Sequence, residues 1–67
     1  MLNAHVEMRS GVSRTVKNLK YVKTLCSDSE NVITEYDSFI INADRYAFVG
    51  DNILTVFGPD ILFVDFY

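Results

Sequence analysis

The stretch YAFVGDNILTVFGPDILFVDFY, residues 46–67, decides the fold class. It contains three short apolar runs that are rich in β-branched and aromatic residues, which is typical of strands. These runs cover residues 46–49, 53–57 and 61–67. Gly50-Asp51-Asn52 and Gly58-Pro59-Asp60 separate them, and their glycine, asparagine and proline residues favour turns. Short strands with turns between them predict an antiparallel sheet.

The upstream sequence extends this pattern less clearly. We expect strands over residues 31–36 and 39–41, separated by a turn at Asp37-Ser38, and a short edge strand over residues 5–8. Apolar residues recur every three positions over residues 16–25, which fits neither a helix nor a strand well. A short helix over residues 14–24 and a strand over residues 19–26 therefore both stay open. We predict one domain, residues 1–67, that is mainly β (with α+β possible): an antiparallel sheet or barrel of four to six strands, with or without one short N-terminal helix.

The small size of the chain limits how it can be stabilised. A domain of 67 residues buries only about 60% of its unfolded surface. The single cysteine, Cys26, excludes an internal disulfide, and the single histidine, His5, argues against a zinc site. We expect no metal and no cofactor, and we expect stabilisation by self-association, as a homo-oligomer, or by a larger partner protein.

Two features of the sequence indicate its compartment. The longest uninterrupted apolar run is far shorter than the 18 or so residues that span a bilayer, so we expect no membrane segment. The first 20 residues carry charges throughout and lack the apolar core of a signal peptide. We therefore expect a soluble protein of the cytoplasm, which is the host cytoplasm if a phage encodes the chain.

Charge is divided unevenly along the chain. Residues 1–26 carry five basic residues against one acid, a net +4, and residues 27–67 carry eight acids against one base, a net −7. The basic segment can pack beside the acidic strands of its own chain, or it can meet the acidic half of another molecule. For the second case we predict that Lys17, Lys20 and Lys23 contact a partner. Nucleic acid is a weaker alternative, because only Tyr21 lies among these bases.

Residues that could support catalysis are few. His5 is the only histidine, and Cys26 beside a strand is more typical of a small core residue than of a nucleophile. The carboxylate pairs Asp28/Glu30 and Glu35/Asp37 suit solvated turns, because a chain this short builds no deep pocket to raise a carboxyl pKa. We expect no catalytic residues and predict that the protein is not an enzyme.

The aromatic residues are the most informative feature for function. Eight of the nine follow residue 35, and the last strand is apolar on both sides. A strand that is apolar on both faces is normally covered on both faces. Either the sheet closes into a barrel, or its outer face packs against another chain. For the second case we predict that Phe63, Asp65 and Tyr67, together with Tyr46 and Phe48, contact a partner.

From Leu19 onward, the order of features resembles small sporulation proteins of the YabP/YqfC type. The residues that carry the resemblance are 28–32, 39–42, Ile53-Leu54, and Gly58 through Ile61, Val64 and Tyr67. The chain departs from this pattern at Ala43-Asp44, where that family tends to place a glycine. The resemblance implies a non-enzymatic protein that acts through assembly during spore-coat formation.

These observations together favour binding over chemistry. We predict a small, acidic, non-enzymatic protein-binding module, such as an inhibitor or adaptor encoded by a phage or another mobile element. It would occupy a surface of a larger host protein, as a homodimer or another homo-oligomer. The alternatives are a structural assembly protein of the sporulation type and a weak nucleic-acid binder.

Overall fold

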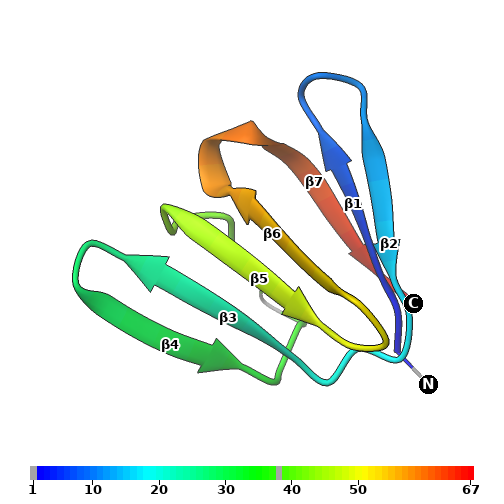
Figure 1. Cartoon of the computed structure of the whole chain (residues 1–67), viewed down its shortest axis with the longest axis horizontal. Helices are drawn as coiled ribbons and strands as arrows, with labels where there is room; N and C mark the ends of the chain where they lie inside the picture. The colour runs from blue at the N-terminus through cyan, green and yellow to red at the C-terminus, as the bar shows by residue number, and fades with distance from the viewer. Residues whose placement is uncertain (1, 38) are drawn as a thin grey trace.

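The computed structural model describes residues 2–37 and 39–67, which form seven strands in two antiparallel sheets (Figure 1). The three-stranded sheet has the order β2-β1-β7 and is built from β1 (Ala4–Met8), β2 (Ser13–Val16) and β7 (Ile61–Phe66). The four-stranded sheet has the order β4-β3-β5-β6 and is built from β3 (Tyr21–Cys26), β4 (Ser29–Ile33), β5 (Arg45–Val49) and β6 (Ile53–Phe57). A single 3-10 turn, Gly58–Asp60, joins β6 to β7.

The predicted class, mainly β and antiparallel, is confirmed, with seven strands in place of four to six. The two sheets do not close into a barrel. Within the described residues there is no α-helix, so the helix considered for residues 14–24 is wrong. Val16 and Val22 are both buried, but they belong to different strands, because the chain reverses near Asn18, whose φ is 53°. The spacing of three thus comes from a turn between two strands.

The core lies between the two sheets and is formed by alternate residues of each strand. On β1, Ala4 and Val6 are fully buried, while His5 and Glu7 lie on the opposite face. On β5, Tyr46 and Phe48 are fully buried in the same way. The buried hydrophobic residues are Ala4, Val6, Val16, Val22, Ala43, Tyr46, Phe48 and Ile61. Burial of each large side chain contributes about 1.5–3 kcal/mol, so this narrow layer supplies most of the stability.

A β-bulge at the start of β7 changes which residues face the core. Glu7 lies opposite Phe63, but Met8 lies opposite Ile61, which leaves Leu62 as the extra residue. Simple alternation would place Ile61 on the outer face with Phe63. The bulge instead turns Ile61 inward, where it is 2% exposed, and leaves Leu62 50% exposed.

The segment between β4 and β5 crosses the open side of the two sheets, and we call its described residues, 34–37 and 39–44, the strap. The strand predicted over residues 39–41 is wrong, because these residues form no ladder. They still alternate: Phe39 and Ile41 pack on the core, and Ile40 is 66% exposed. The strand predicted over residues 31–36 is shifted to Ser29–Ile33, and the turn expected at Asp37-Ser38 includes Ser38, which lies outside the described residues.

Hydrogen bonds fasten the C-terminal end of the strap to the rest of the fold, among them those of Tyr46 and Gly58. The hydroxyl of the buried Tyr46 accepts hydrogen bonds from the backbone N–H groups of Asn42 (2.7 Å) and Ala43 (2.9 Å), and it donates one to the carbonyl of Ile40 (3.1 Å). The N–H of Gly58 donates to the carbonyl of Asp44 at 2.8 Å. The strap is therefore held by backbone groups at its C-terminal end, where β5 begins.

Candidate protein-interaction surface

The outer side of the four-stranded sheet carries apolar residues on each of its four strands. Because Val22, Tyr46 and Phe48 point into the core, their neighbours on the same strands point outward. The outward apolar residues are Tyr21, Leu25, Val32, Ala47, Val49, Ile53 and Phe57, and we call this set the apolar sheet face. Val32, Ile53 and Phe57 are 57%, 67% and 56% exposed. An antiparallel sheet with one face on the core normally carries polar residues on the other, so this face is unusual.

Cross-strand pairing orders the outward side chains into three rows. The first row is Tyr21, Val49 and Ile53, the second is Val32, Lys23, Ala47 and Thr55, and the third is Glu30, Leu25, Arg45 and Phe57. A shallow depression around the small side chain of Ala47 lies in the middle of the face, with Lys23, Arg45 and Thr55 at its sides.

Three charged groups interrupt the apolar sheet face. Lys23 forms an ion pair with Glu30 of β4, with 3.1 Å between Nζ and Oε1, and its hydrogen bond to this carboxylate raises the pKa of Lys23. On the other half of the face, the guanidinium of Arg45 lies 5.3 Å above the ring centre of Phe57, a cation–π contact. Glu30 and Arg45 therefore lie on opposite halves of the apolar sheet face.

The structure corrects the predicted role of Tyr46 and Phe48. Both are 0% exposed and lie between the sheets, so neither contacts a partner in this fold. The prediction was wrong because it did not establish which face of β5 is inside. Their outward neighbours on this strand are Arg45, Ala47 and Val49.

Phe63, Asp65 and Tyr67 share the outer face of the three-stranded sheet. Phe63 is 42% and Tyr67 is 61% exposed, and Asp65 lies across from His5 of β1. Among the described residues, no strand pairs with the second edge of β7. We call these three residues the β7 strip; partner contact there stays a prediction.

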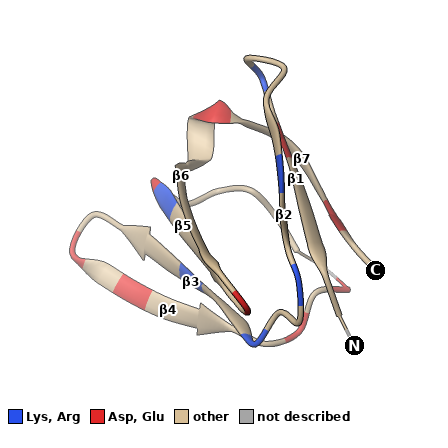
Figure 2. Ribbon diagram, turned by 45° about the vertical axis from the view of Figure 1, so that its right-hand side comes forward, with Lys and Arg blue, Asp and Glu red and all other residues tan. Residues whose placement is uncertain are grey.

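The three lysines do not form one basic surface. Lys23 is on the apolar sheet face, paired with Glu30, whereas Lys17 and Lys20 lie in the connection between β2 and β3. There, the carbonyl of Lys17 accepts the N–H of Asp51, and the N–H of Lys20 donates to Val49. Figure 2 shows the basic segments spread over both sheets and their connections, with acidic segments between them. The division of charge along the sequence is thus not a division in space.

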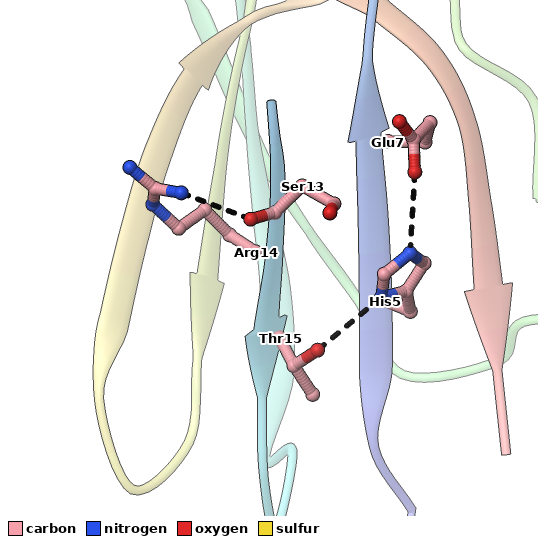
Figure 3. Close-up of polar contacts among 5 residues, drawn as sticks. All are labelled: His5, Glu7, Ser13, Arg14 and Thr15. Carbon is pink, nitrogen blue, oxygen red and sulfur yellow. Dashed lines mark hydrogen bonds and ion pairs between the residues drawn. The ribbon is translucent and has the colours of Figure 1, made fainter. Parts of the chain in front are cut away.

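His5 is at the centre of a polar cluster on the outer face of the three-stranded sheet (Figure 3). Its Nδ1 lies 3.3 Å from Oγ1 of Thr15, and its Nε2 lies 3.4 Å from Oε1 of Glu7. This order of hydroxyl, imidazole and carboxylate is that of a nucleophile with its base. However, His5 and Glu7 lie on the central strand β1, and Thr15 lies opposite His5 on the edge strand β2, so the contacts join neighbouring residues on one face of the sheet. The His5–Thr15 contact is a cross-strand pair and the His5–Glu7 contact joins two residues of β1, and both are ordinary contacts on a sheet surface.

The remaining candidates for chemistry stay apart. Cys26 is an exposed free thiol at the end of β3, which corrects its interpretation as a core residue. It lies on a different sheet from His5. Residues 2–37 and 39–67 contain no group of three or more His, Cys, Asp or Glu side chains that could hold a metal ion. Nor do they include a helix with the length and apolar character needed to cross a bilayer.

Sequence reasoning missed Ile53 and Phe57, two strongly exposed residues of the apolar sheet face. Leu54 and Val56 alternate with them on β6 and pack on the core. The signal was present, because β6 reads as apolar on both faces, like the last strand. A strand that is apolar on both faces is expected to be buried on both faces. The sequence pattern does not say which face packs on the core of its own chain.

Comparisons with known proteins give no relative: the sequence matches no family model and no curated protein, and the fold matches no solved structure.

Proposed function

We propose that this chain is a non-enzymatic protein-binding module whose contact surface is the apolar sheet face. One observation carries the proposal: the four-stranded sheet is apolar on its outer side, and the fold is an open pair of sheets in which no described segment covers that side. Exposed apolar patches of this kind mark interaction sites on soluble proteins.

The partner that best fits this surface is a larger protein with an apolar surface of its own. Protein interfaces combine apolar contact area with polar and charged groups, and Lys23, Glu30 and Arg45 provide such groups here. We extend the proposal to an inhibitor or adaptor, such as one encoded by a phage or mobile element, that acts in the cytoplasm by occupying the partner's surface. This role needs no catalytic residue and no cofactor.

Site-specific photocrosslinking tests the contact surface. With a photoreactive phenylalanine at Ile53 or Phe57, we expect crosslinks to a larger protein in the cells that encode the chain. The matched control is Val12, which is 43% exposed in the turn between β1 and β2 and lies away from the face. Equal crosslinking from Val12 and from the face, or none from the face, would contradict the proposal.

Replacement of Ile53 by Asp complements the crosslinking. Ile53 is 67% exposed, so the variant should keep the fold, with a change of about 0.5 kcal/mol or less in the free energy of unfolding. A buried carboxylate in an apolar interface is costly, so captured partner should fall at least tenfold relative to the wild type. Phe63→Asp, on the β7 strip, is the control. If capture falls only with Phe63→Asp, the contact surface is the β7 strip instead.

A structural assembly protein is the second candidate, which is also the role that the sporulation-type resemblance implies. Two separate surfaces favour it: the apolar sheet face and the β7 strip belong to different sheets, so one copy can contact two neighbours. Contacts between two different surfaces of identical chains lead to rings or to open assemblies. Crosslinks from both surfaces to further copies of the chain, in particles larger than a dimer, would favour this candidate over the first.

A further inference from the structure

We propose that a second copy of this chain binds the apolar sheet face, in a twofold dimer whose axis runs parallel to the strands between β3 and β5. The inference rests on the proposed function, because it takes this face as a contact surface, and it adds the partner. Its basis is the placement of charge and small side chains over the three rows.

A twofold axis in the plane of the face has two simple orientations. An axis across the strands, through the second row, would place Lys23 against Lys23 of the second copy, which is repulsive. An axis along the strands stacks β3 of one copy on β5 of the other. Lys23 then lies opposite Ala47, and Leu25 lies opposite Arg45. Two sheets packed in this way keep their strand directions within about 30°.

The orientation along the strands pairs opposite charges. Glu30 lies next to Leu25 in the third row, so the Arg45 side chain that faces Leu25 from the second copy comes beside Glu30. The twofold axis makes this contact twice. Each Glu30 would then lie between Lys23 of its own chain and Arg45 of the other, which satisfies both bases.

The same orientation also matches shapes. Ala47 is the smallest side chain on the face and lies in its central depression, with Lys23, Leu25 and Thr55 around it. In the dimer this depression faces Lys23 of the second copy. The aliphatic part of a lysine can lie along apolar surface while its ammonium group stays at the rim, beside Glu30. A small residue thus faces a long one across the axis.

The size of the face sets the expected affinity. The three rows hold eleven residues per copy, while a standard interface has roughly 20–30 residues a side. We therefore expect a weak, reversible dimer. A tighter partner protein would displace the second copy, so self-association and the proposed function are compatible.

Charge exchange tests the dimer. Sedimentation equilibrium would be run on the wild type, Glu30→Arg, Arg45→Glu, the double variant, and an equimolar mixture of the two single variants. We expect each single variant to dimerise at least tenfold more weakly, because like charges then face each other. The double variant and the mixture should recover nearly wild-type association, because each restores two opposite pairs. Circular dichroism checks that both single variants keep the fold.

The possible results separate cleanly. Loss of association in both single variants with recovery in the mixture would support the twofold dimer. A wild type that is monomeric at millimolar concentration, single variants that associate like the wild type, or a mixture no better than its components would each overturn it. Phe63→Asp would be run in the same way, and association lost only in that variant would also overturn the twofold dimer, since the interface would then be the β7 strip. The photocrosslinking result is independent of these outcomes, so a monomer that still crosslinks a larger protein from Ile53 would remove the dimer and keep the proposed function.

Discussion

Replacement of Tyr46 by Phe is expected to destabilise the fold by about 3 kcal/mol, although it removes one oxygen atom. The Tyr46 hydroxyl is fully buried and makes three hydrogen bonds, two from the N–H groups of Asn42 and Ala43 and one to the carbonyl of Ile40. Each buried polar group left without a partner costs about 1–3 kcal/mol. For a domain of this size, 3 kcal/mol corresponds to a fall of roughly 12–24 °C in Tm.

Thermal and urea unfolding would measure the effect, with Tyr67→Phe as the matched control. Tyr67 is 61% exposed, so loss of its hydroxyl should change the unfolding free energy by less than about 0.5 kcal/mol. Hydrogen exchange adds a local readout: the amides of Asn42 and Ala43 should exchange faster in Tyr46→Phe. If Tyr46→Phe were as stable as Tyr67→Phe, the strap would not depend on this hydroxyl.

Replacement of Gly58 by Ala is expected to lower the free energy of unfolding by a similar amount, about 3 kcal/mol, because the added methyl group does not fit. The added methyl group would overlap the carbonyl oxygen of Ala43 and lie 3.3 Å from a ring carbon of Tyr46. The strap cannot simply move away, because the N–H of Gly58 donates to Asp44 at 2.8 Å. Differential scanning calorimetry would show the loss as a lower Tm and a lower unfolding enthalpy.

Gly11→Ala is the control for Gly58→Ala. Gly11 has a φ of 92°, but a Cβ there would meet nothing within 4 Å. Gly11→Ala therefore tests backbone strain in the absence of steric overlap. We expect it to lower the free energy of unfolding by about 1 kcal/mol. Gly58 has no positive φ, so overlap is the cost expected there, and a loss at Gly58 no larger than that at Gly11 would contradict the expected value of about 3 kcal/mol.

The class of fold was predictable because it depends on local signals. The turns at Gly50-Asp51-Asn52 and Gly58-Pro59-Asp60 lie where they were expected, and so do the strands on either side. The partition into two sheets was not predictable, because strand pairing depends on contacts between residues far apart in the sequence. The segment 39–41 shows the limit: it has the alternation of a strand, but it lies where no neighbour is available to form a ladder.

The candidate surface was predicted only in part. Phe63, Asp65 and Tyr67 lie on an outer face as expected, and Lys23 is on the apolar sheet face. Tyr46 and Phe48 are core residues, because a strand that is apolar on both sides gives no sign of which side faces the second sheet. The bulge at Leu62 was not predicted either. One inserted residue reverses which side chains face the core and which face outward among the strand residues before it.

The pairing of β1 with β7 has a consequence for how the chain folds during synthesis. Residue 3 and residue 67 exchange two backbone hydrogen bonds, so the three-stranded sheet is complete only after residues 61–67 have been made. The hairpins β3–β4 and β5–β6 involve near neighbours and can form earlier. In that interval the four-stranded sheet exposes apolar residues on both sides, so aggregation of nascent chains should be greatest just before β7 leaves the ribosome.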